Sequence, residues 1–179
     1  SKDFSGWCGK AEILYKYLGS HEDAIVSYDE ALKIKPFNSS IWFDKGVCLY
    51  ELGRYSEALY CYDKAIEISP NSSKFWNNKG IVLKRLVRYG EAIACFDKAK
   101  ELDGMNVSSW YNRGLTLDEM GQYEEAIRSF DKALELDPEN ADAWNNRGVT
   151  LKSLEFYDEA IKSFENAIES NPNYAMAWN

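Results

Sequence analysis

The chain has 179 residues, with 29 acidic and 21 basic side chains and a formal net charge of −8. Hydrophobic residues make up 45% of it and prolines number only four, which is ample apolar surface to fold and excludes an intrinsically disordered chain. An acidic balance removes the attraction to a phosphate backbone, and no apolar run approaches the ~20 residues that span a bilayer, so we expect neither nucleic-acid binding nor membrane insertion.

A step of 34 residues runs through the sequence and indicates a repeat array. Phased from Ser5, the units are 5–38, 39–72, 73–106, 107–140 and 141–174, and residues 175–179 begin a sixth, so we expect a single array within a longer protein. The residues that keep the step include Trp42, Trp76, Trp110, Trp144 and Trp178, Gly46, Gly80, Gly114 and Gly148, and Pro36, Pro70, Pro138 and Pro172.

The first unit departs most from this pattern. Gly19 separates its two expected helices, because glycine readily ends a helix. Trp7 lies one residue ahead of the tryptophan position, Glu12 occupies the glycine position, and His21 stands where a tyrosine is expected. We find no insertion or deletion in the register, so the expectation is an equivalent but looser helix pair.

The second unit shows the pattern in full. Two apolar stripes at helical spacing are separated by Gly53, and Pro70 ends the second. Gly46 and Ala58 are small enough to let the two helices cross closely. The stripes are Trp42, Gly46, Leu49 and Leu52, then Tyr55, Ala58, Leu59, Tyr62, Ala65 and Ile66. Neither helix hides its stripe alone, so each unit is expected to be two short antiparallel helices stacked on their neighbours.

The later units keep this order, with Gly104 in place of a proline in the third. The shared pattern is W-x-x-[K/R]-G-x-x-L, then Y-x-E-A-[I/L]-x-x-[F/Y]-D-K-A, then P, and it resembles the tetratricopeptide repeat (TPR) over residues 5–174. The resemblance implies an all-α fold, a right-handed superhelical solenoid of antiparallel helix pairs, with the first helices lining a concave groove. It also implies a scaffold that binds a protein or peptide partner in that groove.

The resemblance implies that the second, fifth, sixth, ninth, twelfth and thirteenth residues of each unit line the groove. Carboxamides at the sixth position could hydrogen-bond a peptide backbone in a row, although a merely polar exposed face is the alternative. The candidate peptide-binding residues are Phe43, Lys74, Asn77, Asn78, Lys84, Arg85, Tyr111, Asn112, Asn145 and Asn146.

Charge along the groove favours a particular ligand. The third unit holds seven basic and four acidic residues, with Lys74, Lys84 and Arg85 on groove positions between acidic neighbours. This predicts a ligand with an acidic segment, unless the lysines are ordinary solvated charges. The two-carboxylate clamp of chaperone-binding TPR proteins is not expected, because a clamp that starts in the first unit would need Gly9, Ile13 and Asp44 to do the work of lysine and asparagines.

A second function remains open at the end of the array. The helix that begins at residues 175–179 has no room to finish, so we expect Ala160, Phe164 and Ile168 of the last unit to be incompletely covered. Uncapped solenoid ends invite contacts between copies. Head-to-tail self-association is therefore the alternative to peptide binding.

The basic residue of the pattern replaces a leucine that is common in the family. Each one follows an aspartate of the preceding unit by sixteen residues, which pairs Lys45 with Asp29, Lys79 with Asp63, Arg113 with Asp97 and Arg147 with Asp131. We predict a ladder of ion pairs between units, in which the basic stems also cover apolar surface. The alternative is that both partners face water.

No sign of catalysis appears in the sequence. The four cysteines, Cys8, Cys48, Cys61 and Cys95, do not have zinc-ligand spacing, and His21 is the single histidine. We expect reduced thiols packed as small core residues, which favours a reducing, cytoplasmic location. Nucleotide-binding and nucleophile motifs are missing, so we predict no cofactor, no metal and no enzymatic activity.

Overall fold

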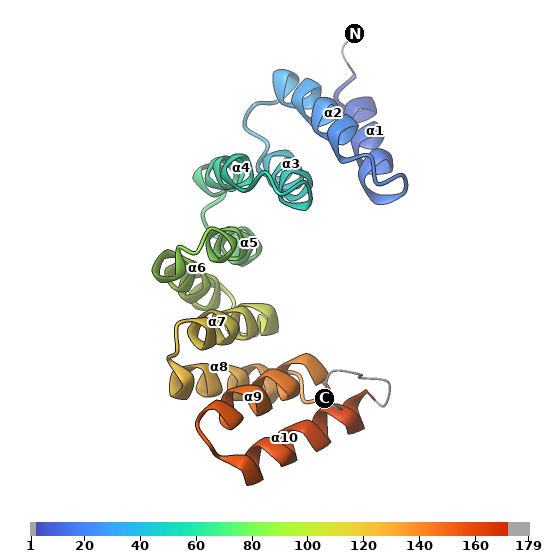
Figure 1. Cartoon of the computed structure of the whole chain (residues 1–179). Coiled ribbons are helices and arrows are strands. Elements are labelled where there is room, and N and C mark those ends of the chain that lie inside the picture. The colour runs from blue at the N-terminus through green and yellow to red at the C-terminus, as the bar shows by residue number, and fades with distance from the viewer. Residues whose placement is uncertain (1–2, 172–179) are drawn as a thin grey trace. The chain divides into compact units, whose positions relative to one another are not determined.

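The computed structural model describes residues 3–171, which form ten α-helices and, in that range, no strand (Figure 1). Each first helix of a pair has 13 residues and each second helix has 14. The helices are α1 Phe4–Lys16, α2 His21–Ile34, α3 Ser39–Glu51, α4 Tyr55–Ile68, α5 Ser73–Arg85, α6 Tyr89–Leu102, α7 Val107–Glu119, α8 Tyr123–Leu136, α9 Ala141–Ser153 and α10 Tyr157–Ser170. None of these helices is long and apolar enough to cross a membrane.

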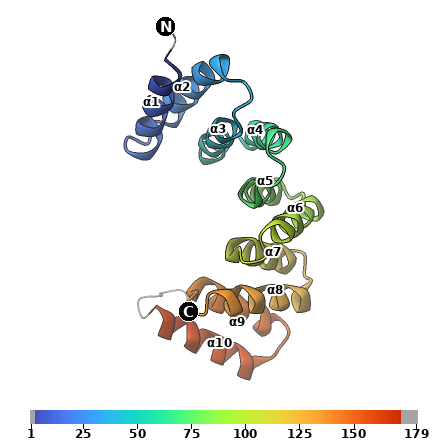
Figure 2. The ribbon, with the colours of Figure 1, turned by 180° about the vertical axis from the view of Figure 1, so that it is seen from behind.

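The chain divides into two compact units, residues 1–87 and 88–179. The first holds α1 to α5, and the second holds α6 to α10. Within each, consecutive helices pack side by side, and the antiparallel pairs are visible from both sides (Figures 1 and 2). Every helix therefore buries its apolar stripe against the helices before and after it.

The ends of the helices follow from single residues. Asn38, Asn106 and Asn140 accept a backbone N–H of the first turn at 3.2, 3.1 and 2.9 Å, as expected of N-caps. First helices end on a left-handed residue, which is a glycine at Gly53 and Gly121 with φ of 72° and 73°. The predicted helix breaks at these glycines are confirmed.

A close approach between paired helices explains the other conserved step of glycines. A Cβ added at Gly46 would lie 2.6 Å from Tyr62, and one at Gly114 would lie 2.6 Å from Phe130. Both rings are almost completely buried. The crossing that we expected at Gly46 is therefore confirmed, and the aromatic ring fills the space that a larger residue would occupy.

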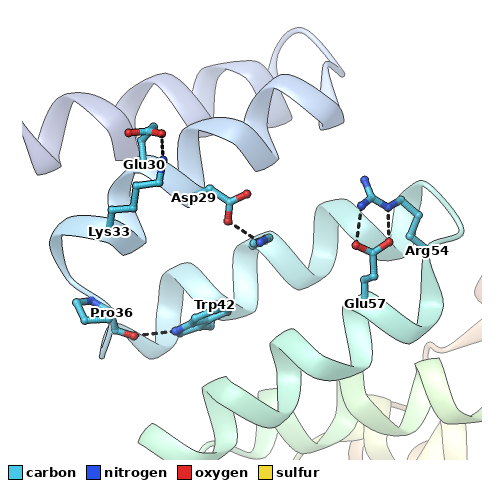
Figure 3. A network of polar contacts seen from close by, with 8 residues as sticks. Asp29, Glu30, Lys33, Pro36, Trp42, Arg54 and Glu57 are labelled. Atoms are coloured by element: carbon cyan, nitrogen blue, oxygen red, sulfur yellow. Dashed lines mark hydrogen bonds and ion pairs between the residues drawn. The ribbon is translucent and has the colours of Figure 1, made fainter.

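The tryptophans tie each first helix to the turn before it. The indole Nε1 of Trp42 donates to the carbonyl oxygen of Pro36 at 2.8 Å (Figure 3), and Trp144 does the same to Pro138 at 2.8 Å. Trp110 donates to Gly104 at 3.1 Å. The turn needs the carbonyl group and not the proline ring, which explains why glycine is tolerated at position 104.

The ladder of ion pairs is confirmed at all four positions. Nitrogen–oxygen distances are 2.5 Å for Lys45 and Asp29 (Figure 3), 2.7 Å for Lys79 and Asp63, 2.9 Å for Arg113 and Asp97, and 2.6 Å for Arg147 and Asp131. The basic side chains are only 18–23% exposed, because their stems lie on the core. The ammonium groups of Lys45 and Lys79 also lie 5.7 and 5.6 Å from the ring centroids of Trp42 and Trp76.

Arginine and lysine rungs of this ladder differ in one further bond. Arg113 and Arg147 each donate a second N–H, to the hydroxyls of Ser129 and Ser163, both at 2.7 Å. The lysine rungs have a cysteine at the same spacing, such as Cys61 for Lys45. A guanidinium has two N–H groups to direct at different partners, whereas an ammonium is a single point. Serine therefore accompanies arginine in this chain.

The register of the first repeat is a correction to the sequence analysis. α1 begins at Phe4, which is 35 residues before α3 at Ser39, whereas later first helices begin 34 residues apart. The turn after α1 has one additional residue, and Ser20 donates its N–H to the carbonyl of Leu14 across it. Ala11, fully buried, therefore takes the small-residue position that we had assigned to Glu12.

The displaced register restores the family pattern in α1. Trp7, Lys10 and Ala11 now correspond to Trp42, Lys45 and Gly46. The Lys10 ammonium lies 5.3 Å from the centroid of the Trp7 ring, much as in the later repeats. The first repeat is thus a regular helix pair with one residue inserted in its turn.

The expected exposure of the last helix is partly wrong. Ala160 is 3% exposed because it packs on its own first helix, while Phe164 and Ile168 are half-buried. The exposed side chains of α10 are instead Tyr157 and Ile161, at 58% and 55%. The helix expected to begin at 175–179 lies outside the described residues.

The cysteines are reduced thiols, as expected. Cys48, Cys61 and Cys95 are buried in the core, and Cys8 is half-buried. Burial raises the pKa of Cys48 to about 12 and that of Cys61 to about 11, so both stay protonated at neutral pH. They act as small apolar side chains.

Candidate functional site

A cavity of about 500 Å³ lies between α1, α3 and α5 in the first unit. Three consecutive first helices and one residue of α2 line it, which is where the resemblance placed the groove. The lining residues are Cys8, Glu12, Tyr15, Lys16, Tyr28, Ile41, Phe43, Asp44, Val47, Lys74 and Asn78. Ligand sites commonly have this size and this mixture of apolar and polar walls.

The floor of the cavity is a rigid aromatic cluster. Phe43 is 4% exposed and stacks on Phe75 with ring centroids 5.0 Å apart. Its other neighbour, the ring of Tyr62, lies at 5.5 Å. The ammonium of Lys74 lies 4.3 Å from the centroid of the Phe43 ring, in a cation–π contact. Packing from three helices therefore fixes the floor in one position.

Two polar groups of the cavity have no partner. Asp44 is half-buried and forms no hydrogen bond or ion pair with the described residues. Burial raises the pKa of its carboxyl, while the charges of Lys74 and Lys16 act in the opposite direction. Tyr28 is 4% exposed, and its hydroxyl likewise has no hydrogen-bond partner in the described chain. Unpaired buried polar groups are uncommon and call for an explanation.

The remaining polar side chains of the cavity are engaged. Lys16 pairs with Glu12 at 2.6 Å on the same helix. The amide of Asn78 donates to the carbonyl of Lys74 at 2.8 Å, which leaves the side-chain oxygen of Asn78 as an acceptor. The cavity thus offers mainly hydrogen-bond acceptors to a ligand.

Of the candidate residues in the first unit, the structure gathers Phe43, Lys74 and Asn78 around the cavity. Asn77 is 7% exposed and faces the core, so it has little surface for a ligand. Arg85 donates to the hydroxyl of Tyr50 at 3.2 Å. Lys84 and Arg85 do not line the cavity.

The candidates in the second unit bond among themselves. Asn146 donates from one amide nitrogen to the hydroxyl of Tyr111 at 3.1 Å and to the carbonyl of Asp142 at 2.7 Å. Burial raises the pKa of Tyr111 to about 12, with a smaller contribution from Asp142. Asn145 is 5% exposed, and Asn112 is half-buried. A backbone-binding row of asparagines stays a prediction.

Sequence reasoning missed half of the cavity. Cys8, Glu12, Tyr15 and Lys16 come from α1, whose displacement by one residue moved the groove positions away from those that a strict 34-residue step assigns. Trp7, one residue early, was the signal for this shift. Asp44 was noted only as an acidic neighbour, and nothing in its residue type indicates that it lacks a partner.

No cluster suited to a metal ion occurs among the described residues: no three His, Cys, Asp or Glu side chains converge there. The polar groups of the cavity come from different helices and are not arranged as a nucleophile with a base. The geometry suits recognition of a ligand.

Comparison with family models gives the tetratricopeptide repeat at five places. One model matches residues 39–72, 107–140 and 141–174, which together exceed half of the chain. Two further models of the same repeat match residues 61–94 and 5–38. A comparison with curated protein sequences gives no match.

Solved structures share the fold over nearly the whole chain. YrrB, described as a TPR protein with an unusual peptide-binding site, is 25% identical, with 99% of this chain and 91% of that one covered and a TM-score of 0.78. MamA residues 41 to the end, from Desulfovibrio magneticus RS-1, is 22% identical, with 96% and 97% covered and a TM-score of 0.87. Another MamA crystal structure, at 24% identity, covers 88% of this chain and 92% of its own, with a TM-score of 0.81. The expected all-α solenoid fold is confirmed.

Proposed function

The chain belongs to the tetratricopeptide repeat family, and from this premise we propose that it is a scaffold that binds an extended peptide segment of a partner protein across its first helices. Proteins built from this repeat are typically interaction scaffolds without catalysis, and we assign no reaction to the chain. The similarity to YrrB, described as having a peptide-binding site, supports a peptide as the ligand.

The cavity between α1, α3 and α5 carries the proposal. It combines a fixed aromatic floor with two unpartnered polar groups, Asp44 and Tyr28. Leaving such groups without partners costs folding free energy, of the order of ~1–3 kcal/mol for each if it were fully buried. A ligand that satisfied them would recover part of that cost on binding.

Selection from a random phage-displayed peptide library on the whole chain tests this function. We expect enrichment of peptides whose binding, measured by isothermal titration calorimetry, is lost in Val47→Arg, because Val47 lines the cavity and arginine would fill it. Val26→Arg is the matched control, since Val26 is 59% exposed on α2 and lies outside the cavity. Equal binding by the wild type and Val47→Arg would place the ligand elsewhere.

Self-association is the second candidate, because one observation favours it. Tyr157 and Ile161 of α10 are 58% and 55% exposed, whereas Tyr123 and Ile127, at the same positions of α8, are half-buried by the next first helix. The face of α10 therefore has the composition of a covered surface. If it meets a second copy, sedimentation velocity between micromolar and millimolar protein will show association that Ile161→Glu abolishes. A constant monomer excludes this candidate.

A further inference from the structure

The cavity in the first unit has a definite electrostatic character. Its two cationic residues are already occupied: Lys16 pairs with Glu12 at 2.6 Å, and Lys74 lies over the Phe43 ring at 4.3 Å. Neither forms an ion pair with Asp44. The Asp44 carboxylate therefore remains available to a ligand, and it is shielded enough from water for a new ion pair to matter.

The groups around Asp44 respond to its charge. Burial and then the negative field of Asp44 raise the pKa of Tyr28, and the same two causes in the same order raise the pKa of Cys48. Such a field disfavours an anionic ligand beside Asp44 and favours a cation.

The walls of the cavity suit a cation in a second way. Tyr15, Tyr28 and Phe43 contribute aromatic rings to the lining. A ring attracts a positive charge through its quadrupole, and a guanidinium also stacks on a ring as a flat group. The Tyr28 hydroxyl, the Asn78 side-chain oxygen and the Asp44 carboxylate can each accept a hydrogen bond, and a guanidinium carries five donors.

Resting on the proposed function, we propose that this cavity holds a basic side chain of the bound peptide, arginine in preference to lysine, with Asp44 as its counter-ion and Tyr28 as a hydrogen-bond acceptor. The acidic segment expected from the basic third repeat is the competing ligand. That expectation is weakened for the cavity, because Arg85 bonds Tyr50 and Lys74 caps the Phe43 ring.

Four blocked pentapeptides, N-acetylated and C-amidated with glycines around one central residue, test the inference. The central residues are arginine, lysine, citrulline and glutamate. Citrulline keeps the shape of arginine without its charge. In ¹H–¹⁵N NMR titrations of the whole chain at millimolar peptide, we expect amide shifts on α1 and α3, with arginine binding more tightly than lysine and citrulline and glutamate binding weakest.

Two variants identify the groups responsible. Asp44→Asn keeps the shape of the side chain, and we expect it to weaken the arginine peptide by about tenfold or more, as for loss of a charged hydrogen bond. Tyr28→Phe removes only the hydroxyl and should weaken it severalfold. Glu22→Gln, which removes a negative charge from an exposed site on α2 outside the cavity, should have no effect.

Three results overturn the inference: citrulline binding as tightly as arginine, glutamate binding more tightly, or no shift with any of the peptides. Unchanged affinity in Asp44→Asn also overturns it. The proposed function is judged separately, by the library-selected peptides and Val47→Arg. If those peptides bind and Val47→Arg blocks them while the arginine peptide fails, only the basic side chain is wrong.

Discussion

Val87 occupies a backbone conformation that suits glycine. Its φ is 60°, and the same position in other repeats holds Gly53 and Gly121. A β-branched residue is strained there, at a cost of ~1–3 kcal/mol, and Val87 is 67% exposed, so it recovers little by packing. We expect Val87→Gly to stabilise the protein by ~1 kcal/mol in urea unfolding, after the greater flexibility of glycine in the unfolded chain is subtracted.

The reverse change serves as the matched control. Gly53→Val places the same side chain at a φ of 72° and should destabilise the protein. A cavity-free, exposed turn excludes packing as the cause, since nothing lies within 4 Å of a Cβ at Gly53. If Val87→Gly lowers stability, the backbone at this turn is not strained.

Asp44 gives a prediction on pH. Burial raises the pKa of its carboxyl above the ordinary value of 3.8. When the folded pKa of an acid exceeds the unfolded one, its favourable contribution is full below the unfolded pKa and is lost as pH rises through the folded pKa. Asp44→Asn should therefore be more stable than the wild type at neutral pH, and thermal melts should converge as the pH falls below the unfolded pKa.

Glu22→Gln controls for the loss of charge, because Glu22 is exposed and no shift of its pKa is invoked. An Asp44→Asn variant that is less stable at neutral pH would mean that the carboxylate has a partner within the fold. Greater stability joined to weaker arginine binding would identify Asp44 as a residue kept for recognition at a cost in stability.

At the residue scale, the sequence was sufficient where the period applies. Val87 and Glu155 fall on the glycine position of the turn, so their positive φ follows from the register. The availability of Asp44 could not be predicted in this way. It depends on Lys16 bonding to Glu12 and on Lys74 lying over Phe43, which are choices among several partners within reach.

At the scale of the helix pair, the glycine at each crossing sets the distance between helices. A Cβ at Gly114 would lie 2.6 Å from Phe130, whose ring is fully buried and cannot move aside. We expect Gly114→Ala to lower the free energy of unfolding by ~1–3 kcal/mol, as for overpacking. Gly9→Ala is the control: it lies in α1 with nothing within 4 Å, so helix propensity should make it stabilising by ~0.5–1 kcal/mol.

The arginine rungs of the ladder predict a coupling. Arg113 donates to Asp97 at 2.9 Å and to Ser129 at 2.7 Å, whereas the lysine rungs have cysteine in place of the serine. Arg113→Lys and Ser129→Cys should each destabilise the protein by ~1 kcal/mol, because each leaves a polar group without its bond. The double variant recreates a lysine rung, so a double-mutant cycle should show ~0.5–1 kcal/mol of rescue. Strict additivity of the two losses contradicts the coupling.

Between elements, the sequence predicted the ladder and missed the displacement of α1. The ladder follows from a separation of sixteen residues across a turn of fixed length, so all four pairs obey one geometry. The turn after α1 has one additional residue, and α2 is in register with the later second helices, so counting from the glycines, alanines and prolines does not reveal the shift. The cavity, which depends on α1, was therefore only partly predicted.

At the scale of the molecule, fold class and family could be read from the period, because each repeat solves the same packing problem. Interactions that recur between adjacent repeats should then contribute in proportion to their number. The ladder is the clearest case, with one rung between consecutive repeats and aspartates that are 41–52% exposed. Partly exposed pairs of this kind are worth ~0.5–1 kcal/mol each.

Replacing the four aspartates together tests whether the array behaves as a sum of its contacts. We expect the variant with Asn at Asp29, Asp63, Asp97 and Asp131 to lose ~2–4 kcal/mol, close to the sum of the single losses, because the rungs share no partners. The control changes Glu30, Glu67, Glu101 and Glu135 to glutamine, which removes exposed pairs within single helices. Both variants change the net charge from −8 to −4 by removing four negative charges, so relief of global repulsion is matched. Urea midpoints that fall equally in the two variants would show that the ladder contributes no more than surface pairs do, whereas a larger fall in the aspartate variant would show that contacts between repeats hold the array together.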